Sequence, residues 1–237
     1  MAEIITKAYL INRKDYELFD EIITFINEYG NIFTVLALGV KKILSKNSRN
    51  LFYGCLSEFE FFSSRDIDNK IGKLKKVSIL ENNIDISNRF PLILLNKAIY
   101  VCKLKGTNVF EYLSYIVLLL KNVEEKFDNK IVLKILAKLT SFLGIKPILN
   151  RCSCCSSKDI YTFSFVNNGF VCKNHFDIKN DTKYDNEIIK IIYLSFYGNK
   201  FINTEFNEFY IKVVSRIYID YILDKSGVNL YFITNEI

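Results

Sequence analysis

Most of the chain's residues that favour metal ions are concentrated in one short stretch. The sequence has six cysteines and one histidine in 237 residues, and residues 151–176 hold four of the cysteines and the histidine. Cys152 and Cys155 are spaced C-x2-C, and Cys172 and His175 are spaced C-x2-H. Four thiolate and imidazole ligands complete the tetrahedron that structural zinc prefers. The two pairs therefore predict one zinc ion in a zinc finger over 151–176.

The residues between the two pairs favour the same site. The segment IYTFSFVNNGFV predicts two short strands around an Asn-Asn-Gly turn, which would bring the pairs together. Four protein ligands leave no open coordination position, so this zinc would be structural. Cys154 is expected outside the coordination sphere. The alternative is a surface hairpin with unligated thiols. A redox role is disfavoured because the C-x2-C pair does not begin a helix after a strand.

No pattern typical of a catalytic site accompanies the predicted zinc. The sequence contains no P-loop, no H-E-x-x-H and no G-x-S-x-G motif. Its single histidine is assigned to the metal, so none remains for a Ser-His or Cys-His pair. We therefore expect that the protein is not an enzyme.

Two basic segments suggest a nucleic-acid surface on a chain with a net charge of +6. The first, over 41–50, has no acid and carries Lys41, Lys42, Lys46 and Arg49. The second, over 70–76, carries Lys70, Lys73, Lys75 and Lys76. Aromatic residues nearby, most of them expected in the core or on the sheet surface, are Phe52, Tyr53, Phe59, Phe61 and Phe62. Such segments can follow phosphates while aromatic rings stack on bases. The alternative is that the lysines are only solvated.

A third basic feature lies on a predicted helix. Lys130, Lys134 and Lys138 recur every four residues and therefore share one helix face. The other residues from 131 to 139 are apolar, so most of this helix must be buried. A lysine stripe beside apolar surface suits a peptide that ends in acids and a hydrophobic residue. The alternative is that the stripe solvates the open side of a core helix.

The elements that must position these residues change character near residue 88. Strands are expected at 3–12, 21–26, 32–40, 50–62 and 72–80, which suit a small barrel over 1–80. Helical spacing follows at 108–125, 131–144, 184–198 and 205–225. Gly144 and Pro147 favour an end to the second of these helices. The sequence thus predicts an α+β protein with a barrel domain over 1–80 and a helical domain over 81–237.

The N-terminus lacks the basic and apolar regions of a signal peptide. The densest apolar run, over 115–120, is too short to cross a bilayer. We therefore expect a cytoplasmic protein with no membrane partner. Thiols stay reduced in the cytoplasm, so clustered cysteines favour a metal over a disulfide.

Taken in order, these segments resemble the RecO family of bacterial recombination mediators. The resemblance covers nearly the whole chain and is carried by ALGVKKILSKNSRN, KILAKLTSFLGIKPILNRCSCC, GFVCKNH and RIYIDYILDKSG. Three positions depart from the family's pattern. Ser156 stands where Gly is common, His175 where the last ligand is often Cys, and Leu136 where an acid is usual.

The resemblance implies an N-terminal OB-fold barrel and an α-helical domain with an inserted zinc finger. It also implies a nucleoid-associated DNA repair and recombination protein that binds and anneals single-stranded DNA without ATP. Such a protein would engage the C-terminal tail of single-stranded-DNA-binding protein through its helical domain, where Lys134 and Lys138 lie, and with RecR would help to load RecA. The alternatives are an RNA-binding OB/zinc-finger module and a non-enzymatic adaptor whose lysines are only solvated.

Overall fold

The structure is a computed structural model, and it describes residues 2–63, 71–198 and 201–233. The chain divides into two units, Met1–Glu125 and Lys126–Ile237. These units place the first two helices with the strands, whereas the sequence predicts a division after residue 80, which stays a prediction. Of the described helices, none combines the length and the apolar character needed to span a bilayer.

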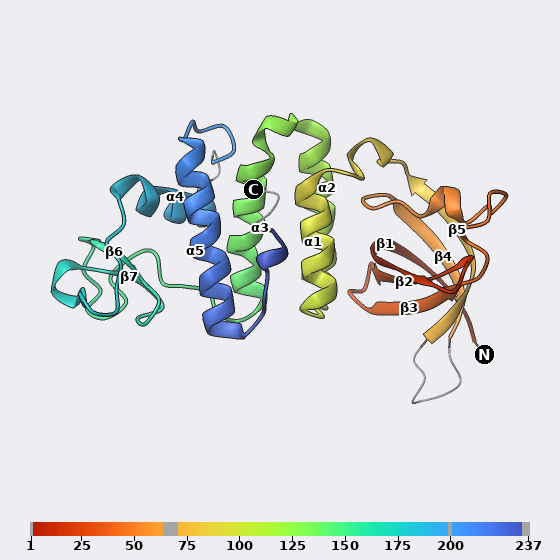
Figure 1. The fold of residues 1–237 in the computed structure, drawn as a ribbon, viewed down its shortest axis with the longest axis horizontal. Helices are drawn as coiled ribbons and strands as arrows, with labels where there is room; N and C mark the ends of the chain where they lie inside the picture. The colour runs from red at the N-terminus through yellow and green to blue at the C-terminus, as the bar shows by residue number, and fades with distance from the viewer. Residues whose placement is uncertain (1, 64–70, 199–200, 234–237) are drawn as a thin grey trace. The chain divides into compact units, whose positions relative to one another are not determined.

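The first unit begins with a closed barrel (Figure 1). Its strands are β1 (Glu3–Tyr16), β2 (Asp20–Asn27), β3 (Ile32–Ala37), β4 (Leu56–Phe62) and β5 (Ile71–Glu81). The strand order is β1-β2-β3-β5-β4, and the pairs are antiparallel except for the parallel pair β3–β5. The expected OB-fold barrel is confirmed. The fourth strand begins at Leu56 rather than at residue 50, because residues 53–54 form a turn.

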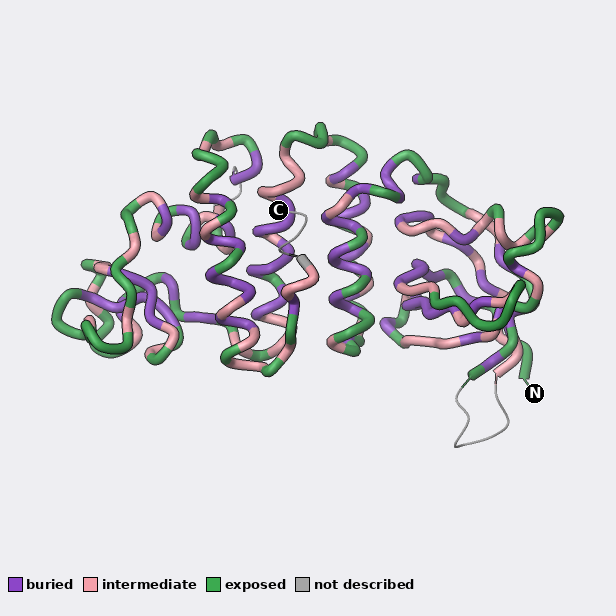
Figure 2. The backbone as a smooth tube through the Cα atoms, viewed as in Figure 1, coloured by how far each residue is buried: buried purple, intermediate pink, exposed green. Residues whose placement is uncertain are grey.

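Successive side chains of a strand point to opposite faces, and one set forms the core of the barrel. Buried and less buried residues accordingly follow one another along the strands (Figure 2). Phe25 lies at the centre of this core, with its ring centroid 4.3 Å from that of Phe59 and 5.3 Å from that of Phe61. On β1 both faces are buried near the middle of the strand, because the helix α1 (Phe90–Val101) packs against its outer side. Tyr9 belongs to that outer face, and its ring centroid lies 5.2 Å from that of Phe110 in the helix α2 (Thr107–Asn122).

Two helices complete the first unit, α1 (Phe90–Val101) and α2 (Thr107–Asn122). No helix was predicted for α1, because its residues are apolar on nearly every side and leave no clear polar stripe. Most of these residues are buried in the structure. The buried Arg89 precedes it and donates to the carbonyls of Leu120 and, at 2.7 Å, Val123. This guanidinium therefore satisfies backbone carbonyls at the end of α2 that no helical N–H can reach.

The second unit contains α3 (Asp128–Phe142), α4 (Asn186–Tyr197), α5 (Glu208–Ser226) and a hairpin of β6 (Thr162–Ser164) and β7 (Gly169–Val171). Helix α3 packs against both α4 and α5. The predicted α+β class is confirmed. The expected Asn-Asn-Gly turn is part of a longer connection, since residues 165–168 separate the two strands.

Candidate metal centre and basic surfaces

Two tight turns present the predicted metal ligands. In the first, the N–H of Ser156 donates to the carbonyl of Cys152 at 3.0 Å, so that Cys152 and Cys155 face the same side. In the second, the N–H of His175 donates to the carbonyl of Cys172 at 3.0 Å, within a short 3-10 turn that follows β7. Each C-x2 spacing thus lets one turn carry two ligands.

The structure brings the four ligand atoms together, all within 4.8 Å of one another. The Sγ atoms of Cys155 and Cys172 are 3.7 Å apart. Nδ1 of His175 lies 3.3 Å from Sγ of Cys172 and 3.8 Å from Sγ of Cys152. Tetrahedral zinc, with bonds of about 2.3 Å to sulfur and about 2.0 Å to nitrogen, separates its ligands by roughly 3.5–3.8 Å. The cluster could therefore hold a metal ion, and its donor set suits zinc.

The hairpin positions these turns through close backbone contacts. The N–H of Phe170 donates to the carbonyl of Ile148 at 2.8 Å, which places the segment before the first turn beside β7. A Cβ atom at Gly169 would lie 2.2 Å from the oxygen of Ile148, so only glycine permits this approach. The buried ring of Phe163 lies 5.4 Å from that of Tyr221 and anchors the hairpin to α5.

Hydrogen bonds favour ionisation of two of the thiols. The pKa of Cys152 is lowered to about 6. Burial by itself would raise this pKa, but hydrogen bonds from the backbone N–H groups of Cys172, Cys155 and Cys154 together outweigh it. The pKa of Cys172 is lowered chiefly by its hydrogen bond with His175, and the same bond raises the pKa of the imidazole. A metal ion binds thiolates, so the lowered pKa values of Cys152 and Cys172 favour a cation, whereas Cys155, whose pKa is raised, and the imidazole must give up their protons to it.

The first basic segment lies on the connection between β3 and β4. Its four basic residues are all exposed, although the side chain of Lys41 is only partly so: Lys41, Lys42, Lys46 and Arg49. Asn47 ties the connection to β5, because its amide donates to the carbonyl of Lys75 at 3.3 Å and accepts from the N–H of Val77 at 3.1 Å. The tertiary structure thus brings the two basic segments side by side.

Ion pairs separate the lysines of this surface into two groups. Nζ of Lys75 lies 2.5 Å from Glu3 and 3.4 Å from Glu60, and Nζ of Lys76 lies 3.5 Å from Glu60. Nζ of Lys41 lies 2.6 Å from Asp15. Among the described residues of these two segments, the basic side chains that make no ion pair are Lys42, Lys46, Arg49 and Lys73. Lys70, which the sequence assigns to the second segment, lies outside the described residues.

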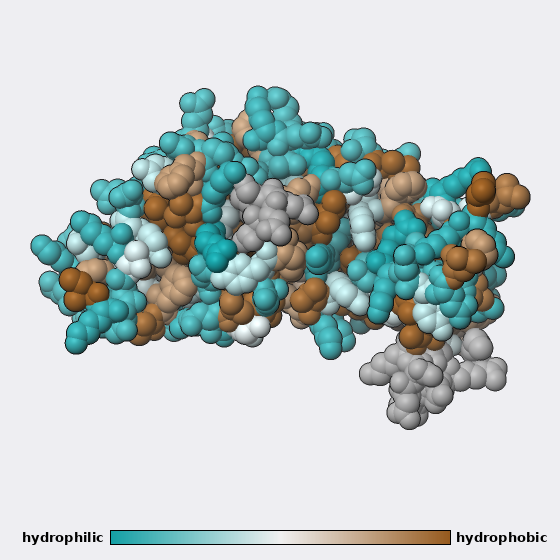
Figure 3. All heavy atoms as spheres, viewed as in Figure 1, coloured by the Kyte–Doolittle hydropathy of each residue, from teal (hydrophilic) through white to brown (hydrophobic). Residues whose placement is uncertain are grey.

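Apolar side chains lie exposed within the first basic segment, and the sequence reasoning missed them. Ile43 is 93% exposed and Leu44 is 87% exposed. Hydrophobic side chains are visible among hydrophilic ones over the barrel surface (Figure 3). Of the aromatic residues considered for base stacking, Phe59 and Phe61 are buried in the barrel core, while Phe52, Tyr53 and Phe62 are half-buried. The signal that could have found Ile43 and Leu44 is an apolar pair flanked on both sides by lysines.

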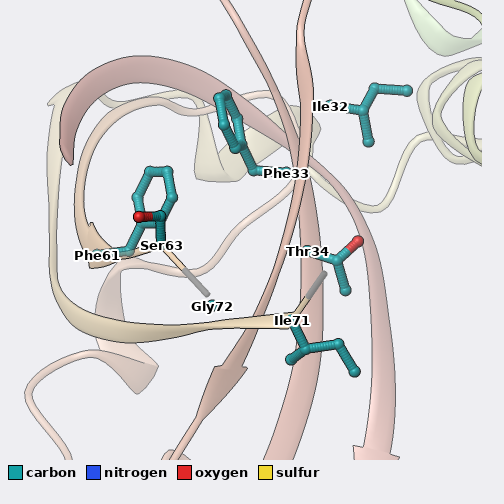
Figure 4. A pocket seen from close by; sticks show the side chains of 7 residues that line it. All are labelled: Ile32, Phe33, Thr34, Phe61, Ser63, Ile71 and Gly72. Atoms are coloured by element: carbon teal, nitrogen blue, oxygen red, sulfur yellow. The ribbon is translucent and has the colours of Figure 1, made fainter. Parts of the chain in front are cut away.

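One end of the barrel holds a hollow of about 440 Å³ between β3 and β5. Phe33 and Phe61 lie on the inner side of β3, whereas Ile32 and Thr34 lie on its other side (Figure 4). The ring centroids of Phe33 and Phe61 are 5.1 Å apart. None of the described residues that line this hollow is charged.

The lysine stripe of α3 is engaged within the second unit. Nζ of Lys130 donates to the carbonyls of Ile202 and Thr204, at 3.0 and 2.7 Å. The half-buried Lys134 donates to the carbonyl of Gly198 at 3.4 Å, and burial lowers its pKa. Lys138 is exposed at the end of the stripe, 5.0 Å from the ring centroid of Phe142. Two of the three lysines therefore hold the segment after α4.

Comparison with known proteins gives one consistent result. No family model matches the chain. The chain is 29% identical to the DNA repair protein RecO of Mycoplasma mycoides over 233 residues, which cover 93% of this chain and 92% of that protein. It is 28% identical to the DNA repair protein RecO of Mesoplasma florum, over 98% of this chain and 89% of that protein. It is 32% identical to the DNA repair protein RecO of Bacillus pumilus over 183 residues, 72% of this chain and 68% of that protein.

Substitution of one ligand tests the metal centre. We expect about one zinc per chain in the purified protein, and a loss of most of it in Cys172→Ser, because a tetrahedral site with three ligands binds weakly. Cys154→Ser is the matched control, since it removes a neighbouring thiol outside the cluster and should retain the metal. Elemental analysis measures both. Protons compete with the metal for the thiolates, so zinc should be released as the pH falls into the acid range. Equal metal content in the two variants would contradict the assignment.

Ser156 provides a second test, because its φ angle of 63° lies in the left-handed region. A non-glycine residue there costs roughly 1–2 kcal/mol, and glycine's greater freedom in the unfolded chain offsets part of the gain from replacing it. We expect Ser156→Gly to increase the free energy of unfolding by about 0.5–1 kcal/mol, measured on the metal-loaded protein by chemical denaturation. Ser153→Gly serves as the control and should not increase the free energy of unfolding. A destabilised Ser156→Gly variant would show that the turn is not strained.

Proposed function

Because this chain belongs to the RecO family of DNA repair proteins, we propose that it binds single-stranded DNA along the basic side of its barrel. The observation that carries the proposal is the Asn47 tether, which holds the segment of Lys42, Lys46 and Arg49 against β5. This arrangement gives a strand several cations on one preformed surface. An OB-fold barrel with a basic loop is a common platform for unpaired strands.

The exposed Ile43 and Leu44 favour an unpaired strand over a duplex. In a duplex the bases are stacked inside, and a surface of lysines alone is sufficient to hold its phosphates. Unpaired bases offer apolar faces that exposed side chains can cover. Apolar and basic residues on one loop therefore suit a partner with both apolar bases and negative phosphates. Holding two such strands with their bases accessible would promote annealing without ATP and without catalytic residues.

The remaining roles concern protein partners and the metal. We assign one structural zinc to the cluster of Cys152, Cys155, Cys172 and His175, where it would stabilise the hairpin. The helical unit would receive the acidic C-terminal tail of single-stranded-DNA-binding protein, and the protein would act with RecR to load RecA in the cytoplasm, near the nucleoid. Lys130 and Lys134 already bind backbone carbonyls. Lys138 is the exposed member of the stripe, and we assign the contact with the tail to it.

The basic loop is tested by replacing Lys41, Lys42, Lys46 and Arg49 with alanine. Each lost phosphate contact should flatten the slope of log affinity against log salt by about 0.7 for a single strand. We expect weaker binding to oligo(dT) and a shallower slope, measured by fluorescence anisotropy at several salt concentrations. The matched control removes the same number of exposed charges elsewhere, at Lys7, Lys121, Lys158 and Lys212.

Three outcomes of this experiment would count against the proposal. An unchanged salt slope in the loop variant would place the DNA site elsewhere. Tighter binding to structured RNA than to single-stranded DNA at matched salt would favour an RNA-binding module. Failure of the unmodified protein to bind any nucleic acid at low salt would favour an adaptor.

The tail interaction is tested by charge reversal at Lys138. Reversing one exposed charge changes its interaction with an acidic peptide by about 1 kcal/mol, or roughly fivefold in affinity. We expect Lys138→Glu to weaken binding of a tail peptide by about that factor while leaving oligo(dT) binding unchanged. Lys212→Glu, on the exposed side of α5, is the control. Equal loss of peptide and DNA binding would assign the stripe to DNA, and loss of neither would leave Lys138 as a solvated residue.

A further inference from the structure

A second hollow lies in the first unit, between the outer side of the β2–β3 hairpin and the turn that joins α1 to α2. Its volume is about 510 Å³. Thr24, Ile32 and Thr34 line the barrel wall, and the opposite wall is formed by the turn, with Tyr100, Lys103 and Lys105. None of the described residues that line the hollow is acidic. Its position differs from that of the basic loop, and nothing in the sequence analysis pointed to it.

The two walls are held together by backbone contacts. The N–H of Gly106 donates to the carbonyl of Gly30 at 2.9 Å. A Cβ atom on Gly30 would lie 2.0 Å from the carbonyl carbon of Gly106, so only glycine allows the two turns to meet. The buried side chain of Asn27 accepts from the N–H groups of Tyr29 and Asn31 and so stabilises the β2–β3 turn. The hollow is therefore preformed.

The α1–α2 turn presents cations at some conformational cost. Helix α1 ends in a Schellman motif, in which the N–H of Leu104 donates to Ile99 at 3.0 Å and the N–H of Lys103 donates to Tyr100 at 3.3 Å. Lys103 has a φ of 51°, at the position where this motif usually has glycine. Among the described residues, the amines of Lys103 and Lys105 make no ion pair. Both charges are therefore available at the mouth of the hollow.

The hollow continues the surface already assigned to DNA. In the β3–β5 pair, Thr34 is opposite Ile71 and Leu36 is opposite Lys73. Paired residues share one side of a sheet, and Thr34 lies on the outer side of β3 (Figure 4). The exposed Lys73 therefore lies on the same outer face as the hollow, only two residues further along β3. A DNA strand that contacts Lys73 can therefore reach the hollow along the surface of the barrel.

We propose that this hollow binds one unpaired nucleotide, with the base against Tyr100 and the adjacent phosphates on Lys103 and Lys105. The inference rests on the proposed function and extends it with a defined subsite. Tyr100 is 40% exposed, which gives a base access to its ring. An aromatic face beside two cations is the combination that a nucleotide requires. An acidic peptide would use the lysines but would gain little from the ring.

The experiment compares substitutions of Tyr100 on two oligonucleotides of about 15 residues, oligo(dT) and an abasic strand of equal length. Tyr100→Ala and Tyr100→Leu should each bind oligo(dT) about tenfold more weakly, since a stacked base contributes roughly 1–3 kcal/mol. Tyr100→Phe keeps the ring and should bind like the unmodified protein. None of the three should alter binding to the abasic strand. Tyr100→Leu keeps apolar bulk, so it guards against a loss that reflects poor folding.

The lysines are tested in the same assay. Lys103→Ala with Lys105→Ala should flatten the salt slope by about 1.4 on both strands, whereas Lys7→Ala with Lys121→Ala should not. If the pocket variants bind as the unmodified protein does while the basic-loop variant is weakened, the subsite is wrong and the proposed function stands. If the unmodified protein binds neither strand, the proposed function fails and the subsite with it. If the pocket variants lose binding to an acidic peptide but keep their binding to oligo(dT), the hollow would be reassigned to a protein partner.

Discussion

The barrel closes through a parallel pairing of only three residues, Thr34–Leu36 of β3 with Ile71–Lys73 of β5. An open sheet of five strands would leave two edges of unpaired backbone groups, which closure removes. Closure also decides the side on which each side chain lies. Phe25 and Phe59 are enclosed, whereas Lys73 must face outward. The basic surface and the outer hollow both depend on this assignment of inner and outer faces.

In the second unit, the β6–β7 hairpin is too small to fold by itself. Strands β6 and β7 have three residues each, and an isolated two-stranded hairpin is marginally stable in water. Two kinds of contact compensate. The ring of Phe163 packs on Tyr221 of α5, and the four ligands at the far end offer a metal ion a complete tetrahedron. The strained Ser156 shows why glycine suits its position, and the buried Leu136 contributes to the core where the resemblance expects an acid.

Lysine has several distinct roles in this protein, and charge alone does not separate them. Lys134 is half-buried and binds a backbone carbonyl, so its charge serves the fold of the second unit. Lys75 and Lys76 lie against Glu60, although exposed pairs of this kind contribute little to stability and can exchange partners. Lys46, Lys73 and Lys103 lie in solvent. A phosphate can therefore bind these last three without displacing a carboxylate.

Features that depend on local spacing could be predicted from the sequence. The C-x2-C and C-x2-H pairs, the strand-rich first 80 residues and the helices α2 to α5 all follow from short-range patterns. Helix α1 was missed because its residues are apolar on nearly every side. Only the tertiary structure showed that Lys134 binds a carbonyl, that Phe61 is enclosed and that Tyr100, Lys103 and Lys105 line a hollow. These properties depend on which segments distant in the sequence come into contact, as Gly30 and Gly106 do. Short-range patterns in the sequence do not predict such contacts.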